Sequence, residues 1–365
     1  LDLRTEVTVE ATALGDLLLR TSGATLLNTL ALPSSLKPAQ LRRDASDRAF
    51  YQRKANKADP DVFFKRPNAS RVEMRESSAG MLRFRPDDGS CTLLNFDSPF
   101  RTVNPKLRDR YPRHARNMRA VAQYWRHDDG PRPTIAVIHG FMADPYWLNR
   151  MFFALPWFYR QGYDILLYTL PHHGRRASRL SPFSGHGFFA NGTAHISESF
   201  AHAVHDFRIF LDYLESEGVS KVGVTGISLG GYTSALLASV EERLQFAIPN
   251  VPVVSLADLV LEWFPVNLSI KAMLKATGTS IRDLRHELAV HSALTYQPRI
   301  PRERLMVIAG AGDRLAPPKH ARLLWDHWDR PRIHWFPGNH LLHLDKGKYL
   351  KEMARFMREI EFDRM

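Results

Sequence analysis

From Thr134 to the end of the chain, short β-branched runs alternate with longer amphipathic stretches. The stretch 197–217 places Phe200, Val204 and Phe207 on one helical face, as a crossover helix requires. Six runs have the length and composition of buried strands: 134–139, 164–170, 221–227, 246–254, 305–309 and 332–336. Strands joined by crossover helices lie parallel in one sheet, so this part predicts an α/β fold with a mostly parallel central sheet flanked by helices.

The residues before Thr134 have a different pattern. Runs at 81–85 and 91–96 are separated by the turn sequence Pro-Asp-Asp-Gly-Ser, and 118–126 is another extended run, so we expect antiparallel edge strands. The leucine-rich stretch 11–32 predicts a helix, and the charged stretch 37–57 predicts a surface helix or arm. We therefore divide the chain into a helical, basic N-terminal extension, 1–70, and a main domain, 71–365.

The segment 254–301 is too long for a simple crossover. It contains the apolar stretches 256–264 and 268–276, and we expect it to form a helical lid over the strand ends. Trp263 and Phe264 either line a pocket for an apolar substrate or pack onto the main domain.

Composition limits the partners of the chain. Hydrophobic residues make up 44% of its 365 residues, but no window is long and apolar enough for a membrane-spanning helix, and no secretory signal is visible at the N-terminus. The formal net charge of +12 favours anionic partners, among which we expect peripheral contact with an anionic membrane surface. The arginines lack the pattern of a nucleic-acid module, so no nucleic acid is expected. The single cysteine, Cys91, fits a buried strand position and a cytoplasmic location.

The sequence Gly226-Ile-Ser228-Leu-Gly230 joins the expected strand 221–227 to an expected helix at 232–240. Glycines on both sides of a serine let strand and helix approach closely, and the strained turn then presents the hydroxyl at the sheet edge. Ser228 is therefore a candidate nucleophile. The alternative is a glycine-rich turn with an incidental serine.

A serine hydroxyl needs a base to accept its proton and an acid to orient that base. Asp313 lies in the glycine- and proline-rich loop after the strand 305–309, and His340 lies in the loop after the strand 332–336. Asp258, which follows an earlier strand, is the alternative acid. His343 is the alternative base if a helix begins early, although the Gly-Asn sequence before His340 favours a loop there.

The order Ser, Asp, His at successive strand ends resembles the α/β-hydrolase fold superfamily, in its esterase- and lipase-like serine hydrolase branch, over residues 134–365. The resemblance implies that Ser228 is the nucleophile, His340 the base and Asp313 the orienting acid. It also implies an oxyanion hole made by the backbone amides of Leu229 and Phe141. It implies no cofactor and no metal.

Histidines near these loops have other interpretations. We expect His139 to be structural, with its ring bonded to loop backbone. The sequence His172-His-Gly-Arg-Arg176 resembles the superfamily's Pro-Gly-His-Gly type of loop with one glycine replaced. Adjacent histidines suggest a metal, but no suitably spaced further ligand is evident, so a hydrogen-bonded loop is favoured. Arg175 and Arg176 are expected to be solvated, the alternative being contact with an anionic substrate group.

These residues predict a serine hydrolase that cleaves an acyl bond, most simply a carboxylic ester, of a small-molecule or lipid-like substrate. A serine at the nucleophile position argues against dehalogenases and epoxide hydrolases, which the superfamily marks with aspartate. Thioesterases, peptidases and acyltransferases use the same triad, so they stay open. A noncatalytic membrane- or partner-binding protein on this fold is the alternative from another class.

Overall fold

The strands in the middle of the sheet are buried on both faces, as parallel strands between two helical layers must be. In the computed structural model, which describes residues 3–68, 72–80, 83–111 and 114–363, four strands are buried along their whole length. They are β4 (Thr134–Ile138), β5 (Asp164–Tyr168), β6 (Val222–Ile227) and β8 (Met306–Gly310). Their valine- and isoleucine-rich composition therefore reflects burial on two sides.

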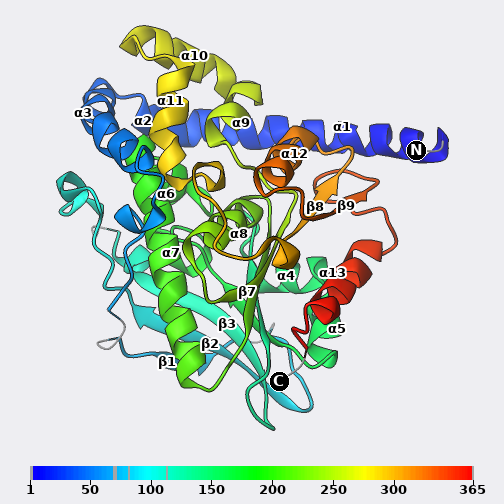
Figure 1. The fold of residues 1–365 in the computed structure, drawn as a ribbon. Helices are drawn as coiled ribbons and strands as arrows, with labels where there is room; N and C mark the ends of the chain where they lie inside the picture. Colours follow the sequence, from blue (N-terminus) through cyan, green and yellow to red (C-terminus); the bar gives the residue numbers. More distant parts are fainter. Residues whose placement is uncertain (1–2, 69–71, 81–82, 112–113, 364–365) are drawn as a thin grey trace.

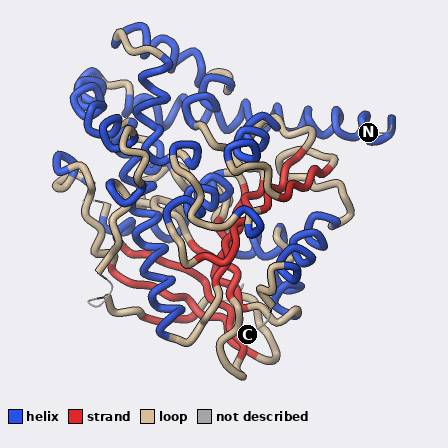
Figure 2. Tube along the Cα trace, viewed as in Figure 1, coloured by secondary structure: helices blue, strands red, loops and turns tan. Residues whose placement is uncertain are grey.

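The sheet of the described residues has nine strands in the order β1-β2-β3-β5-β4-β6-β7-β8-β9 (Figures 1 and 2). The strands from β5 to β9 pair in parallel, and they include β7 (Leu244–Asn250) and β9 (Arg332–Phe336). The other edge is antiparallel, formed by β1 (Arg75–Ser78), β2 (Gly89–Asp97) and β3 (Arg119–His127). The predicted α/β fold with a mostly parallel sheet is thus confirmed.

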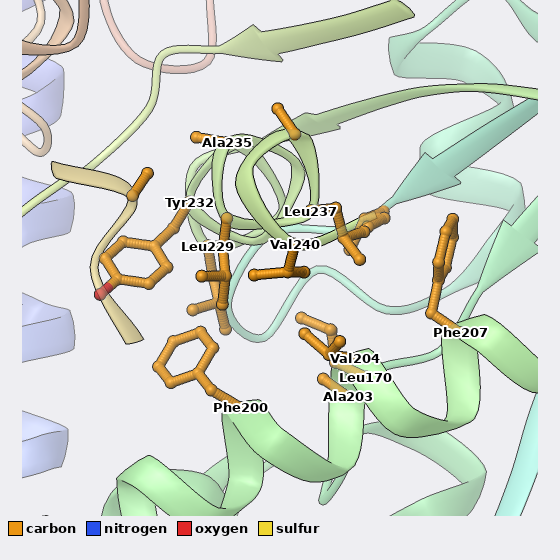
Figure 3. Packing of buried hydrophobic residues seen from close by; sticks show 14 of the residues in the cluster. Leu170, Phe200, Ala203, Val204, Phe207, Leu229, Tyr232, Ala235, Leu237 and Val240 are labelled. Carbon is orange, nitrogen blue, oxygen red and sulfur yellow. The ribbon is translucent and has the colours of Figure 1, made fainter. Parts of the chain in front are cut away.

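Alternating residues of the central strands enter two different cores. Ile135 and Val137 of β4 pack on one face, with α4 (Tyr146–Phe152), α5 (Leu155–Arg160) and α13 (Lys348–Glu359). Ala136 and Ile138 pack on the other face, with α7 (Thr193–Ser216) and α8 (Leu229–Val240). Figure 3 shows Phe200 and Val204 of α7 facing Leu229 and Val240 of α8. The helix that carries the residue after Ser228 is therefore anchored through a packed interface.

The N-terminal segment shares the second core. It consists of α1 (Leu3–Leu26), the π-helix η1 (Leu27–Ala31), α2 (Leu32–Ser35) and α3 (Pro38–Ala55). Tyr51 of α3 is completely buried and donates a hydrogen bond of 3.0 Å to Glu198 of α7. The helical prediction for 37–57 is confirmed, but the helix is no loose surface arm, because one face of it packs into the protein. The boundary at residue 70 stays a prediction.

The insertion after β7 is helical, as predicted. It contains α9 (Leu256–Glu262), α10 (Val266–Thr277) and α11 (Ile281–Leu288). Arg48 of α3 forms an ion pair of 3.2 Å with Glu287 and donates to Thr279 at 2.9 Å. Figure 1 shows these helices beside α1, α2 and α3 at one end of the molecule. The N-terminal helices and the insertion, which are far apart in the sequence, thus pack together at this end.

The other helices whose bounds lie within the described residues are short. They are α6 (His186–Phe189), α12 (Pro318–His327) and 3₁₀ turns at 60–62, 105–107, 115–118, 174–176, 289–291, 293–295 and 302–304. No described helix is both long and apolar enough to cross a bilayer.

Two predicted strands differ from the structure, and one observed strand was not predicted. Residues 83–85 of the predicted run 81–85 are not a strand, and 81–82 lie outside the described residues. The strand expected at 246–254 ends at Asn250, because Val251 turns the chain with a φ of 42°. The edge strand β1 was not predicted, because its sequence Arg-Glu-Ser-Ser is polar and its side chains are largely exposed.

Candidate active site

Ser228 occupies a strained turn between β6 and α8. Its φ of 57° and ψ of −111° lie in a region that side-chain-bearing residues rarely adopt, and its amide donates to the Asn250 carbonyl at 3.0 Å. A Cβ on Gly226 would lie 2.6 Å from the carbonyl carbon of Gly230, and one on Gly230 would lie 2.0 Å from the Ile138 oxygen. Both glycines are therefore required by the close approach of strand and helix, as the motif predicted.

The two predicted oxyanion donors lie beside Ser228. Leu229 is the first residue of α8, where backbone N–H groups have no partner within the helix. The loop after β4 abuts the elbow, since the Cβ position of Gly140 lies 3.6 Å from the Ser228 Cβ. Phe141, the next residue, lines the same cavity as Ser228 and Leu229. Their role as donors is part of the proposal below.

Asp313 and His340 are joined in a buried pair. Asp313 follows β8, and its Oδ1 accepts from the amides of Leu315 at 2.9 Å and Ala316 at 2.8 Å. Its Oδ2 lies 2.6 Å from His340 Nδ1. Burial of the ring opposes protonation, but the Asp313 carboxylate and its hydrogen bond outweigh it and raise the pKa of His340 above its usual 6.5. With Nδ1 donating to the carboxylate, Nε2 is left as the acceptor that a general base needs.

The two alternative residues are engaged elsewhere. The His343 ring packs against Phe336 and Tyr349 at centroid distances of 4.0 and 4.4 Å. Asp258 forms an ion pair of 2.5 Å with Arg285 and accepts from the Ser255 hydroxyl at 2.6 Å. The structure therefore brings together His340 and Asp313, the favoured pair.

Asp16 of α1 was missed by the sequence analysis. Its carboxylate is buried, and its Oδ2 accepts from the amide of His340 at 2.8 Å and from the amide of Arg314 at 3.0 Å. It is the one charged residue between Glu10 and Arg20, in an otherwise apolar and small-residue stretch. A single carboxylate in an apolar stretch was the signal in the sequence that could have indicated this role. If such a residue is buried, its carboxylate needs hydrogen-bond partners.

His139 was predicted to bond loop backbone, and this is confirmed. Its Nδ1 donates to the Gly140 carbonyl at 2.8 Å, and its Nε2 accepts from the Leu170 amide at 3.1 Å. The ring therefore ties the loop after β4 to the end of β5. Burial lowers its pKa.

The loop 172–176 follows the prediction in one part and contradicts it in another. The backbone amide of His172 donates a hydrogen bond of 2.7 Å to Asn117 Oδ1, as expected of a hydrogen-bonded loop. Arg175 is exposed, but Arg176 is completely buried and pairs with Asp206 at 2.6 Å. The expectation of a solvated Arg176 was wrong, because its partner comes from α7, thirty residues away. No three His, Cys, Asp or Glu side chains of the described residues converge as a metal site requires.

A cavity of about 160 Å³ opens beside Ser228. Its wall is mostly apolar and is contributed by the segment 27–36, by α9, α10 and α11, and by Phe141, Leu229 and Tyr232. Trp263 lines it and donates its indole N–H to the Leu315 carbonyl at 3.0 Å. Of the two roles considered for these aromatic residues, Trp263 lines the pocket, whereas Phe264 is exposed.

The α/β-hydrolase fold is defined by a mostly parallel sheet with a nucleophile elbow after one strand, and with an acid and a histidine after two later strands. The chain has the α/β-hydrolase fold, and its residues 88–263 match the family model described as alpha/beta hydrolase domain containing 18. Two uncharacterized proteins of Mycobacterium tuberculosis, Rv2627c and MT2702, are each 33% identical to it over 250 residues, 67% of this chain. The match spans 58% of the length of each of these relatives.

Two solved structures share the fold. Acetyl xylan esterase 1 from Thermoanaerobacterium sp. JW/SL YS485 superposes with a TM-score of 0.58 and 17% identity, covering 86% of this chain and 93% of that one. The acetyl xylan esterase from Paenibacillus sp. R4 gives a TM-score of 0.57 and 15% identity, covering 86% and 94%. At such identities the likeness concerns the fold.

Proposed function

We propose that this protein is a serine hydrolase that cleaves a carboxylic ester through an acyl-enzyme on Ser228. One observation carries the proposal. The loops after β8 and β9 hold Asp313 and His340 in a buried hydrogen bond of 2.6 Å, and β6 of the same parallel sheet ends in the elbow of Ser228. This arrangement supplies a nucleophile, a base and an orienting acid.

The reaction has two halves. Ser228 Oγ attacks the ester carbonyl while His340 Nε2 takes its proton, and the N–H groups of Leu229 and Phe141 stabilise the resulting oxyanion. The imidazolium then gives the proton to the alkoxy oxygen, which leaves as an alcohol. His340 then takes a proton from water, which attacks the acyl-enzyme. The imidazolium returns that proton to Ser228 Oγ as the acid product leaves. Asp313 stays ionised and stabilises the imidazolium in both halves.

A fluorophosphonate probe and graded esters test the proposal. The probe should label Ser228 in folded protein, and Ser228→Ala should lose both labelling and ester hydrolysis. Ser234→Ala, which removes a buried helical hydroxyl bonded to the Gly230 carbonyl, is the matched control and should keep both. Faster turnover of acyl thioesters than of the matching oxygen esters would assign a thioesterase. Absence of labelling in the folded wild type would favour a binding protein on this fold.

Contact with an anionic membrane surface is a further part of the proposal. The net charge of +12 supports it, and Leu14 and Leu18, one helical turn apart on α1, are 65% and 71% exposed. Co-sedimentation with anionic vesicles, and none with neutral ones, is the expected result. Equal sedimentation with both would refute an electrostatic contact.

A further inference from the structure

The cavity beside Ser228 is built by two segments that are distant in the sequence. The N-terminal segment contributes Leu27, Ala31 and Leu32, and the insertion contributes α9, α10 and α11. Both lie at the same end of the molecule (Figure 1). The cavity therefore exists only where this N-terminal segment meets this insertion.

Its wall suits an aliphatic group. Asp44 is the one carboxylate among the lining residues. It accepts a hydrogen bond of 3.0 Å from the Gln40 amide, and burial raises its pKa to about 7. Its oxygens also face the backbone amides of Thr193 and Ala194 at the start of α7. The Asp44 carboxylate is thus hydrogen-bonded within the protein, and the surface that is left for a ligand is apolar.

The volume sets the length of that group. An apolar cavity of about 150 Å³ accommodates benzene, a group of six carbons. The cavity here, of about 160 Å³, is of the same size. We propose that it is the acyl-chain site, shaped for a linear saturated acyl group of about six carbons. This inference rests on the proposed function of Ser228.

Nitrophenyl esters from acetyl to dodecanoyl test this site. Burying one methylene corresponds to about a fourfold gain in binding, so kcat/KM should rise about threefold to fourfold per carbon up to about hexanoyl and then stop rising. Ala31→Phe fills the cavity and should move the optimum to shorter chains, and Leu32→Ala should move it to longer ones. Leu30→Phe, at an exposed neighbouring position, is the control and should leave the profile unchanged.

The outcomes separate the two levels of the proposal. Ser228-dependent hydrolysis with a flat profile, or with an optimum that neither cavity variant moves, would overturn the acyl-chain site alone. Hydrolysis that survives in Ser228→Ala would overturn the proposed function. Because Ala31→Phe can impair folding, a second measurement compares the wild type with Leu32→Ala. The rates of inactivation by methyl and hexyl fluorophosphonates are measured for both proteins. The hexyl fluorophosphonate should inactivate the wild type faster than the methyl fluorophosphonate does.

A second inference comes from the contacts of α1 with the two catalytic loops. The Cβ position of Gly312 lies 2.8 Å from Val9, and that of Gly15 lies 3.7 Å from the Asn339 side chain. Next to Gly15, Asp16 accepts hydrogen bonds from the amides of both His340 and Arg314. One carboxylate oxygen thus bridges the loop of the base and the loop of the acid.

We infer that Asp16 is a positioning residue, which holds His340 against Asp313 through the backbone and adds negative charge beside the imidazole. Its Oδ1 has no hydrogen-bond partner among the described residues, so the whole hydrogen-bonding role rests on the two loop amides. The charges of Asp313 and His340 act on the Asp16 carboxylate, and Arg314, Arg20 and Glu10 are linked to the same loop. Arg20 donates to the Arg314 carbonyl at 3.1 Å, and the Arg314 side chain lies 3.6 Å from Glu10.

The pH profile of the enzyme tests this inference. The charge of Asp16 contributes to the raised pKa of His340, so Asp16→Asn should shift the acid limb of kcat/KM to lower pH. Asp16→Asn keeps an acceptor oxygen and should lower kcat about tenfold, whereas Asp16→Ala loses it and should lower kcat about a hundredfold. Glu10→Gln, on the exposed side of the same helix, is the control. Folded Asp16 variants with unchanged kcat and acid limb would overturn the inference.

Discussion

Asp313 Oδ2 lies 2.6 Å from His340 Nδ1, and the other oxygen of the same carboxylate is held by two backbone amides of its own loop. The carboxylate can therefore neither rotate nor leave the histidine without breaking three hydrogen bonds. This fixes which imidazole nitrogen carries the proton in the resting state. With this geometry, the proposed role of Asp313 as the orienting acid predicts how hydrolysis responds when Asp313 is changed.

Asp313→Asn should lower kcat by about 10⁴-fold and leave the fold intact. The side-chain amide of asparagine can donate a hydrogen bond to His340 Nδ1, which favours the tautomer with the proton on Nε2 and removes the acceptor that the base needs. Ester hydrolysis and thermal unfolding of the purified variant measure the two effects. Asp258→Asn is the matched control, since it removes a carboxylate at the alternative position whose partner is Arg285. A larger loss for Asp258→Asn than for Asp313→Asn would reverse the assignment.

Ser228→Ala should abolish turnover, with a loss of kcat on the order of 10⁶-fold, and should change the melting temperature little. Alanine also carries a Cβ, so the strain of a φ of 57° stays in the variant. Burst and steady-state assays with a nitrophenyl ester, together with a thermal melt, check both statements. Turnover at the wild-type rate would remove Ser228 from the mechanism.

Gly230→Ala should destabilise the protein by about 1–3 kcal/mol, because the new Cβ would lie 2.0 Å from the Ile138 carbonyl oxygen. The same overlap should push the start of α8 away from β4 and β6. Because Ser228 directly precedes α8, activity should fall as well. Gly23→Ala on α1 provides the contrast. Beyond its chain neighbours and the local helix backbone, no described atom lies within 4 Å of its Cβ position, and the substitution should stabilise by up to about 1 kcal/mol. Denaturant unfolding of both variants compares these effects.

The sequence predicted the features that local chemistry determines. β9 was predicted with its observed ends, because its run is bounded by turn residues, and the elbow was found because Gly226 and Gly230 are required at fixed spacing. Residues whose role depends on distant partners were not predicted. Arg176 is buried because α7 brings Asp206 to it.

Asp16 shows the same limit more sharply. It lies 324 positions before the amide that it binds, and no periodicity in α1 reveals that contact. Likewise, the length of the cavity depends on how the segment 27–36 meets α9 and α10, which no motif encodes. The elbow turn and the Asp313–His340 pair could thus be predicted from the sequence, whereas the shape of the cavity required the fold.

The stability of the protein should fall as the pH drops from about 6.5 towards 3. Burial lowers the pKa of His195 and His291 to about 3 and that of His202 to about 4. Over this range the unfolded chain binds protons that the folded chain does not, so each such histidine reduces the free energy of unfolding by about 1.4 kcal/mol per pH unit. Urea unfolding between pH 7.5 and 4 measures the slope.

His343 offers a direct test of this acid sensitivity. Burial, and next the charge of His340, lowers its pKa to about 3, and its Nε2 has no hydrogen-bond partner among the described residues. Its ring packs against Phe152, Phe336 and Tyr349, so phenylalanine fits the same surroundings. His343→Phe should therefore reduce the slope of unfolding free energy against pH by about one proton between pH 6 and 4 and keep ester hydrolysis. An unchanged slope would mean that this histidine is protonated in the folded protein, and loss of hydrolysis would reopen its candidacy as the base.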